Sequence, residues 1–202
     1  MSRPSVDLAS TNLTAPVLYL PDFIGMPRDL FESLVEGLPW SRAGSTPRAE
    51  CYFNDTPAPY TYGHGRGQRT YLPEPSWHPA VMEVRTTLEC TLFELGYGLH
   101  DLDVCFCNLY ENQHDQSGWH ADDSPEMDDL RPVVTVSLGA ERDILLRPRG
   151  AKDPAENQRV RLASGSALVM LPGMQDTWDH RIPKHDRPCG PRVSLTFRGF
   201  VA

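Results

Sequence analysis

Apolar residues recur at helical spacing in two segments of the first half of the chain. The first segment opens at Pro27 and has Gly37 where a helix would end, and the second opens near Ser76 and is closed by Gly96. Their apolar residues are Leu30, Phe31, Leu34, Val35 and Leu38 in the first segment and Val81, Val84, Leu88, Leu92 and Leu95 in the second. This spacing predicts two scaffold helices, each with one face packed against the rest of the protein.

From Asp103 onward the pattern changes to short apolar runs separated by polar turns. The runs cover residues 104–110, 133–138, 144–147, 160–162, 167–171, 178–182 and 193–197. Short strands at this spacing are typical of an antiparallel double sheet. We therefore expect a mainly β protein with flanking helices (α+β), built on a double-stranded β-helix (jelly roll) core.

Between the two predicted helices lies a turn-rich segment, 46–71. Its turn-forming residues are Pro47, Pro57, Pro59, Gly63, Gly65 and Gly67. This composition predicts a working loop without regular structure that exposes its tyrosines. The length of 202 residues suits a single domain. We expect one domain over 1–202, with an N-terminal extension (1–20), a lid region (41–75) and the jelly-roll catalytic core (103–202).

The charge of the chain restricts how it can bind nucleic acid. A formal net charge of -8 argues against a protein that coats nucleic acid by charge alone. The charge is uneven, however, because an acidic stretch at 122–129 is followed by a basic one. The basic residues are Arg142, Arg147, Arg149, Lys152, Arg159 and Arg161. A local basic edge therefore stays open.

The cysteines and the lack of long apolar stretches indicate the compartment. The 5 cysteines are an odd set without the paired spacing of a zinc site, which predicts free thiols in a reducing compartment. No stretch approaches the roughly 20 apolar residues that cross a bilayer. We expect a soluble, intracellular protein without a membrane partner, cytoplasmic in a prokaryote and with the nucleus open in a eukaryote.

His120 and Asp122 form the first pair with a chemical rationale. Residues two apart on an extended segment point to the same side, so the imidazole and the carboxylate can converge on a metal. An isolated His-x-Asp pair is common by chance, but His180 lies on a later predicted strand that a rolled double sheet brings close. Two histidines and one carboxylate suit non-haem iron(II), and zinc-dependent hydrolysis is the competing interpretation.

The strand predicted near the C-terminus carries two arginines on one face. Arg192 and Arg198 alternate with apolar residues and share their side with two hydroxyl residues, Ser194 and Thr196. Buried or half-buried arginines need anionic partners. The partners are either acidic side chains of the chain itself or a dicarboxylate co-substrate, which a guanidinium binds in a two-pronged way.

Short motifs follow one another in a characteristic order along the chain. They are Thr46-Pro47-Arg48, Tyr60-Thr61-Tyr62-Gly63, Asn108-Leu109-Tyr110, His120-x-Asp122, Ser137-Leu138-Gly139, Arg142-Asp143, Gly165-Ser166-x-Leu168, His180 and the stretch from Arg192 to Arg198. Together they resemble the AlkB family of Fe(II)- and 2-oxoglutarate-dependent dioxygenases, in particular the branch of the nuclear DNA-repair homologues. The resemblance covers the chain from about residue 46 to its end.

The resemblance implies a role for each matching residue. His120, Asp122 and His180 would bind iron(II). Arg192 would pair with the distal carboxylate of 2-oxoglutarate, assisted by the hydroxyl of Tyr110, while Asn108 and Arg198 would orient the co-substrate end nearer the metal. The implied reaction is oxidation of an N-alkyl group of a nucleobase by dioxygen, with release of formaldehyde, succinate and CO2. It needs no catalytic residue beyond the metal centre.

The lid region would hold the substrate, because a base must leave its stack to reach the metal and is then usually held by aromatic rings. Tyr60 and Tyr62 match the substrate lid of the family, and Tyr71 is a further candidate. The resemblance adds Asp123 and Arg142 as substrate-binding residues. Candidate phosphate contacts are Arg42, Arg48, Arg66, Arg69, Arg142 and Arg149, although each taken singly is better explained as a surface charge or as the partner of an acid.

Two departures from the family pattern limit the choice of substrate. Ser124 and Pro125 follow Asp123 where the relatives commonly have an acid, and residues 41–45 offer no aromatic wedge to fill the gap left by a flipped base. Alkylated single-stranded DNA or RNA is therefore the expected partner, bound by a monomer without an obligate protein partner. The alternatives are an oxygenase that acts on protein side chains and a noncatalytic nucleic-acid-binding jelly-roll module.

Overall fold

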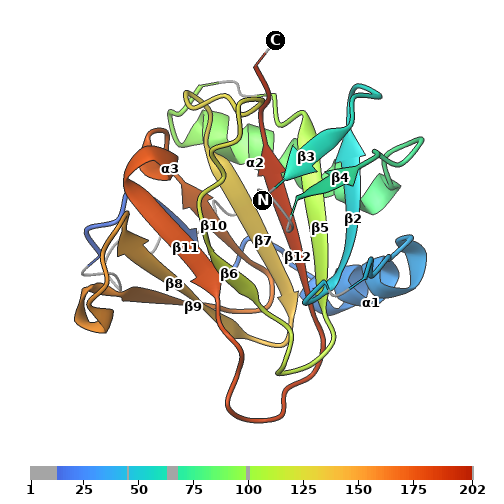
Figure 1. Ribbon diagram of the computed structural model, residues 1–202. Coiled ribbons are helices and arrows are strands. Elements are labelled where there is room, and N and C mark those ends of the chain that lie inside the picture. Colours follow the sequence, from blue (N-terminus) through green and yellow to red (C-terminus); the bar gives the residue numbers. More distant parts are fainter. Residues whose placement is uncertain (1–12, 45, 63–67, 99–100, 202) are drawn as a thin grey trace.

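The computed structural model describes residues 13–44, 46–62, 68–98 and 101–201. Two antiparallel sheets form its body, as a jelly roll requires (Figure 1). The larger sheet has the order β1 (Val17–Leu20), β10 (Ser166–Met170), β7 (Val133–Gly139), β12 (Arg192–Arg198), β5 (Val104–Tyr110) and β2 (Ala49–Asn54). The smaller sheet has the order β6 (Ser117–His120), β11 (Trp178–Ile182), β8 (Arg142–Pro148) and β9 (Gln158–Leu162). The predicted fold class is confirmed.

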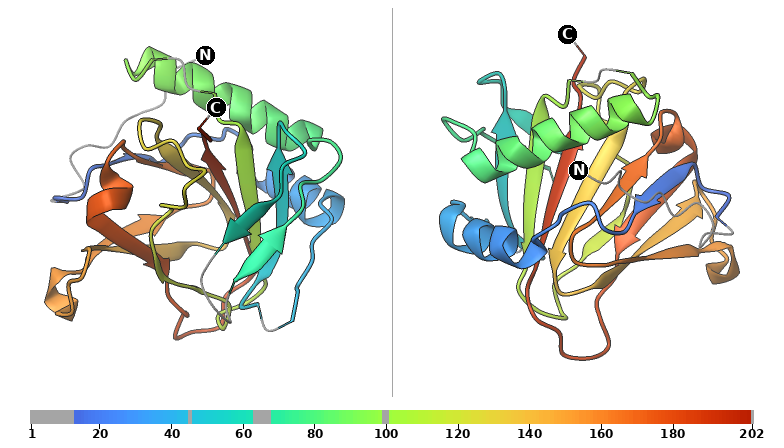
Figure 2. Two further views of the ribbon diagram at one scale, coloured as in Figure 1. Left: turned by 45° about the horizontal axis from the view of Figure 1, so that its top comes forward. Right: turned by 180° about the vertical axis from the view of Figure 1, so that it is seen from behind.

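Two helices cover the outer face of the larger sheet, as Figure 2 shows from behind. They are α1 (Pro27–Gly37) and α2 (Pro79–Glu94), and both match a predicted helix. Helix α2 begins at Pro79 rather than near Ser76, because His78 caps it by accepting a hydrogen bond from the Ala80 backbone nitrogen at 3.3 Å. The remaining helical segments, α3 (Met174–Thr177) and the 3-10 turn η2 (Pro154–Glu156), are short.

Strand β12 separates the two sides of the larger sheet. Its apolar residues Val193, Leu195 and Phe197 are buried in the core under the helices. Its polar residues line a pocket on the other side, between the sheets, and these are Arg192, Ser194, Thr196 and Arg198. The alternation predicted for this strand is therefore confirmed, and it turns a row of polar side chains towards the interior of the jelly roll.

The segment 46–71 is not the irregular loop that its prolines and glycines predict. Strand β2 runs through it with all six residues buried, and β3 (Tyr60–Tyr62) pairs with β4 (Arg69–Tyr71) as a hairpin. The prediction failed because β2 buries two polar side chains, Glu50 and Asn54, whose hydrogen-bond partners are Tyr71 of β4 and Tyr52 of β2 itself. The sequence of β2 has no alternation of apolar and polar residues that would predict a strand. Residues 63–67 lie outside the described part of the chain.

The last residues of the predicted N-terminal extension (1–20) belong to the larger sheet. Strand β1 pairs with β10 along its whole length and forms one edge of the larger sheet, while β2 forms the other. Both edge strands thus come from outside the predicted core of 103–202. The strands predicted within 103–202 are confirmed, but β6 is an addition, since its sequence Ser-Gly-Trp-His has no apolar run.

The cysteines are free, as predicted, and three of them are buried in β2 and β5. The Sγ atoms of Cys105 and Cys107 lie 3.7 Å apart on one face of β5. No helix in the described ranges is both long and apolar enough to span a membrane.

Candidate metal centre and its pocket

His120 and His180 lie directly opposite each other on neighbouring antiparallel strands. They are register partners of β6 and β11, and their ring centroids are 4.2 Å apart. Asp122 follows the end of β6 and joins them, with its carboxylate oxygens 3.9 Å from Nε2 of His120 and 3.8 Å from Nε2 of His180. One ligand atom from each of the three residues lies within 4.8 Å of the others. The predicted triad is therefore assembled.

Two neighbours hold the carboxylate of Asp122 in place. The Asp122 backbone nitrogen donates to Oε1 of Gln175 at 2.9 Å, and Arg198 donates from NH2 to Oδ1 at 2.6 Å. Burial alone would raise the pKa of Asp122, but the charge of Arg198, which also donates a hydrogen bond to the carboxylate, more than offsets it. The pKa of Asp122 thus lies below its ordinary value, and the group is an ionised carboxylate at neutral pH.

The two histidines are held in the neutral form that binds metals. Burial and the neighbouring His120 lower the pKa of His180 to about 3, and burial also lowers the pKa of His120. Nδ1 of His120 lies 2.8 Å from the carbonyl oxygen of Gly118, an arrangement that fixes the tautomer and leaves Nε2 for a metal. Oδ2 of Asp122 and Nδ1 of His180 are buried and lack a hydrogen-bond partner in the described residues. This donor set fits a divalent metal such as iron(II).

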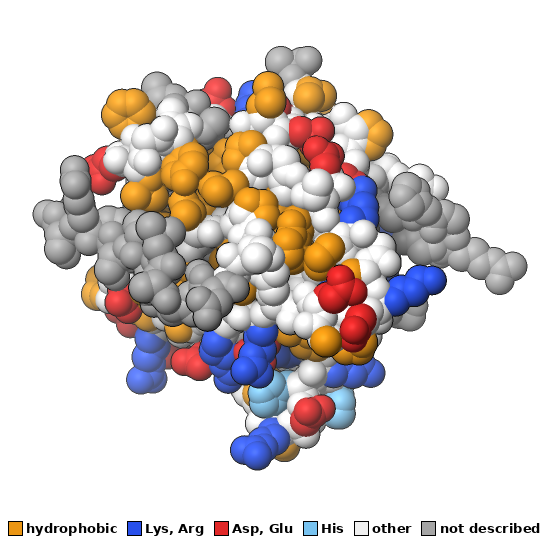
Figure 3. Space-filling model, turned by 90° about the vertical axis from the view of Figure 1, so that its left-hand side faces the viewer, with side chains coloured by type: hydrophobic (Ala, Val, Ile, Leu, Met, Phe, Trp, Pro, Cys, Tyr) orange, Lys and Arg blue, Asp and Glu red, His pale blue; other side chains and the backbone are white. Residues whose placement is uncertain are grey.

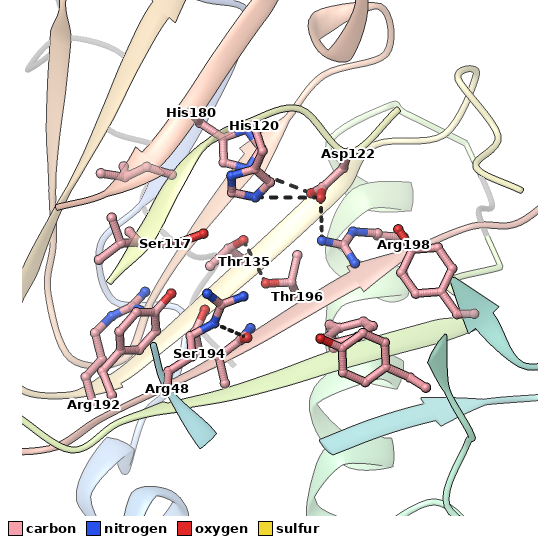
Figure 4. Close-up of a pocket in the computed structure, with 17 residues that line it drawn as sticks. Arg48, Ser117, His120, Asp122, Thr135, His180, Arg192, Ser194, Thr196 and Arg198 are labelled. Carbon is pink, nitrogen blue, oxygen red and sulfur yellow. Dashed lines mark hydrogen bonds and ion pairs between the residues drawn. The ribbon is translucent and has the colours of Figure 1, made fainter. Parts of the chain in front are cut away.

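The triad stands at one end of a pocket between the sheets, and Arg192 stands at the other (Figure 4). Ser117, Thr135, Ser194 and Thr196 lie between them. The row of hydroxyl side chains makes this space polar. A bound molecule that spans the pocket would therefore touch the triad with one end and Arg192 with the other.

Arg192 is fully buried, yet most of its donors remain open. Its Nε donates to Oγ of Ser137 at 2.9 Å, while NH1 and NH2 have no hydrogen-bond partner among the described residues. Burial lowers the pKa of Arg192 to about 10, and the neighbouring Tyr110 opposes this shift. The guanidinium is still charged at neutral pH. Two open donors of a buried cation fit a carboxylate in a two-pronged way.

Asn108 and Tyr110 extend into the pocket from β5, beside Arg192. The Tyr110 ring lies under the Arg192 guanidinium, 5.0 Å from its carbon. Oδ1 of Asn108 accepts a 2.6 Å hydrogen bond from Nε of Arg48. The structure thus brings together seven predicted residues in one pocket, namely His120, Asp122, His180, Asn108, Tyr110, Arg192 and Arg198.

Arg142 is not a surface contact for a substrate, contrary to the prediction. Its side chain is 1% exposed and donates to the backbone oxygens of Asn112, Asp115 and Pro183. It ties two loops to β8 and does not reach the surface. The predicted strand began at residue 144, whereas β8 begins at Arg142, so the sequence did not indicate that this arginine would be buried.

Tyr60 is not an exposed lid residue either. Only 1% of it is exposed, its ring packs against Tyr52, Phe106 and Phe200, and its hydroxyl lies 3.0 Å from Oγ of Ser124. It forms a fixed wall of the pocket. Tyr71 is also tied down, since its hydroxyl donates to Oε2 of Glu50 at 2.8 Å. The Tyr62 side chain lies outside the described part of the chain.

The remaining predicted substrate residues are engaged in ion pairs. Asp123 is half exposed at the surface and pairs with Arg149 at 2.8 Å. Arg198, which was predicted at the co-substrate end nearer the metal, lines the pocket and pairs with the metal ligand Asp122. Among the candidate phosphate contacts, Arg42 pairs with Asp115 at 2.8 Å. Arg66 lies outside the described residues.

Three residues of the site have roles that were not predicted from the sequence. Gln175 fixes the backbone of Asp122, and Glu50 holds both Arg48 and Tyr71 from the back of the pocket. Arg48, a candidate for either a phosphate contact or the partner of an acid, pairs with Glu50 and lines the pocket. Its place in the Thr46-Pro47-Arg48 motif was the available signal, whereas nothing local marks Gln175 or Glu50.

Comparison with known proteins identifies the family. The family model of the 2OG-Fe(II) oxygenase superfamily matches residues 27–198. The chain belongs to this superfamily. It is an Fe(II)- and 2-oxoglutarate-dependent dioxygenase, with iron(II) as its metal and 2-oxoglutarate and dioxygen as co-substrates. The zinc-hydrolase interpretation is thereby set aside.

Within this superfamily, the relatives are AlkB homologues. Human alpha-ketoglutarate-dependent dioxygenase alkB homolog 3 is 30% identical over 209 residues, which cover 96% of this chain and 68% of that protein. Mouse DNA oxidative demethylase ALKBH2 is 32% identical over 162 residues, which cover 78% of this chain and 63% of that protein. The dioxygenase thus belongs to the AlkB family, and it spans about two thirds of the length of these relatives.

A solved structure shares the fold. The structure of OsALKBH1 matches with a TM-score of 0.64 at 17% identity, covering 94% of this chain and 99% of that one. At this identity the likeness concerns the fold alone.

Proposed function

We propose that this dioxygenase removes alkyl groups from N-alkylated nucleobases, such as N1-methyladenine or N3-methylcytosine, in DNA or RNA. The observation that carries the proposal is the pocket with the His-Asp-His triad at one end and the open donors of Arg192 at the other. The names of the relatives, among them a DNA oxidative demethylase, support the substrate class.

In this proposal each end of the pocket has its own task. His120, Asp122 and His180 hold iron(II). Arg192 binds the distal carboxylate of 2-oxoglutarate with its two open donors, and Tyr110 packs against that pair. Arg198 orients Asp122 through their hydrogen bond. Asn108, itself held by Arg48, lines the space between.

The chemistry that bound iron(II) supplies is oxidation of the alkyl carbon, coupled to the conversion of 2-oxoglutarate and dioxygen to succinate and CO2. The oxidised methyl carbon leaves as formaldehyde when its bond to the ring nitrogen breaks. The electron pair of that bond stays on the nitrogen of the restored base, and the hydroxyl proton passes to solvent. The buried wall around the triad keeps bulk water away from the reacting groups, and no side chain is needed as a nucleophile.

A groove beside the pocket would receive the base. It is lined by Trp119, Asp123, Ser124 and others, and it shares Tyr60 and His120 with the pocket. An extruded base in this groove would lie against the wall formed by Tyr60 and present its alkyl group towards His120. Asp123, half exposed at the rim, is placed to accept hydrogen bonds from the base edge.

We extend the proposal to organisation and setting. The chain acts as one domain and as a monomer without an obligate protein partner, on single-stranded DNA or RNA. The hairpin of β3 and β4, with Tyr62, serves as the nucleotide-recognition part of the lid region 41–75. The compartment would be the cytoplasm in a prokaryote, with the nucleus open in a eukaryote.

The test incubates the iron-loaded protein with 2-oxoglutarate and either methylated oligonucleotides or methylated peptides. The expected result is formaldehyde and succinate in equal amounts with oligonucleotides alone. Formaldehyde from peptides only would favour the oxygenase that acts on protein side chains. Succinate formation that no substrate stimulates, together with oligonucleotide binding, would favour a noncatalytic nucleic-acid-binding module.

A further inference from the structure

Trp119 lies beside two guanidinium groups on the outer face of the smaller sheet. It precedes His120 on β6, and adjacent residues of a strand point to opposite faces, so the indole is outside while His120 faces the pocket. The guanidinium carbon of Arg147 lies 4.2 Å from the ring centroid of Trp119, and that of Arg181 lies 4.7 Å from it. These are cation–π distances.

The two arginines differ in their acidic partners. Arg147 donates from both Nε and NH2 to Oδ2 of Asp179, at 3.1 and 3.0 Å. Arg181 makes no ion pair or hydrogen bond within the described ranges, and its buried Nε lacks an acceptor. Of the two cations beside Trp119, Arg147 is therefore neutralised by Asp179, whereas Arg181 is not neutralised by an acid of the described residues. A half-buried cation without such a partner favours binding of an anion.

The surrounding face does not form a broad basic field. Figure 3 shows this side of the molecule, with acidic side chains lying close to basic ones. Arg149 pairs with Asp123, and Arg161 pairs with Asp143. The basic edge that the sequence left open is thus largely neutralised, and Arg181 stands out from its neighbours.

Trp119 also belongs to the groove proposed for the base. It lines that groove together with His120 and Asp123. When the target base of a nucleic-acid strand occupies the groove, the neighbouring nucleotides of that strand must pass over the protein surface beside the groove. Trp119 offers it an aromatic surface, and Arg181 offers it a charge.

We infer that Trp119 and Arg181 form a subsite for the nucleotide that flanks the target base in a single strand. The flanking base packs against the accessible part of the half-buried indole, and the phosphate pairs with the guanidinium of Arg181. The subsite rests on the proposed function for its substrate class. One aromatic ring and one cation suit a protein whose net charge of -8 cannot hold a strand by general attraction.

The test measures binding of an unmethylated single-stranded oligonucleotide of about ten nucleotides, so that the result does not depend on turnover. Arg181→Gln should weaken binding about fivefold and reduce the slope of log Kd against log salt by about 0.7. The matched control is Arg159→Gln, which removes the same charge from β9 at a side chain 71% exposed on the same sheet. The control should leave both values unchanged.

A second pair of variants tests the stacking. Trp119→Phe keeps an aromatic face and should retain binding, whereas Trp119→Leu should weaken it about tenfold. Because Trp119 adjoins His120, the thermal unfolding of each variant is measured alongside, and a weaker affinity at unchanged Tm supports the stacking role.

The subsite is overturned if Arg181→Gln binds with the affinity and salt slope of the original chain, or if the original chain binds no oligonucleotide. A failure of the proposed function gives another result, namely an Arg181-dependent salt slope without formaldehyde release from methylated DNA. Turnover of methylated oligonucleotides together with unchanged Arg181→Gln binding would remove the subsite and keep the function.

Discussion

Arg198 and Asp122 form a buried ion pair at the metal centre, with 2.6 Å between NH2 and Oδ1 and side chains 9% and 1% exposed. The pair decides the orientation of the carboxylate, because Arg198 occupies Oδ1 and leaves Oδ2 facing Nε2 of His180. A residue expected at the co-substrate thus acts on a metal ligand.

Arg198→Met should weaken iron binding about 10- to 100-fold, as is usual when a residue that orients a metal ligand is lost. Anaerobic titration with iron(II) measures the effect, and Asp122→Ala serves as the reference without the ligand, for which we expect no turnover. Unchanged iron affinity in Arg198→Met, combined with a weaker response to 2-oxoglutarate, would assign Arg198 to the co-substrate instead.

Arg192→Met should raise the concentration of 2-oxoglutarate required for half-maximal succinate formation about tenfold or more. The reason is that a charge-assisted hydrogen bond is worth about 1.5 to 3 kcal/mol, and about 1.4 kcal/mol corresponds to tenfold. Oligonucleotide affinity should stay the same. If the requirement for 2-oxoglutarate does not change and only the Tm falls, Arg192 is structural.

Arg142→Met is the counterpart, since it removes an equally buried arginine whose donors are already used. Three backbone oxygens lose their partner, which should lower the free energy of unfolding by about 2 to 4 kcal/mol. Urea denaturation measures the loss. A variant that stays as stable as the original chain but binds oligonucleotide less tightly would restore Arg142 as a substrate contact.

The metal-free protein should lose stability as the pH falls below about 6.5, the ordinary pKa of histidine. The pKa of His180 is about 3 in the folded chain, so between these values the unfolded chain takes up a proton that the folded chain does not. The stabilisation is complete above pH 6.5 and is lost towards pH 3. Urea denaturation in the presence of a chelator should show a weaker dependence on pH for His180→Gln. Equal slopes for the two proteins would speak against a buried neutral His180.

Methylated single-stranded oligonucleotides should be repaired at least about tenfold more efficiently than the same lesion in a duplex, a difference of about 1.4 kcal/mol at the transition state. Residues 41–45 contain no aromatic side chain, and Arg42 is held by Asp115. No side chain in this segment therefore offsets the free-energy cost of unstacking a base from a duplex. Rates of formaldehyde release at matched salt test this, and equal rates would show that another residue fills the gap.

Features with a local signal in the order of the amino acids could be predicted before the structure was known. Strand β12 is predictable from its alternation of apolar and polar residues. The apolar residues at 193, 195 and 197 face the helices, and the polar residues between them face the pocket. The helices were visible in the same way. The metal ligands were visible through the order of the motifs, since chemistry requires His120, Asp122 and His180 whatever surrounds them.

Residues without such a signal acquire their roles from contacts between segments that are distant in the chain. Arg192 and Arg142 are both buried. NH1 and NH2 of Arg192 have no acceptor among the described residues, whereas those of Arg142 donate to backbone oxygens. Tyr60 forms part of the pocket wall because it packs against Phe200, and β2 forms a sheet edge because it pairs with β5. Both partners are distant in the chain. Whether a polar group is free or paired depends on where long-range strand pairing places its neighbours, and local spacing carries no information about that.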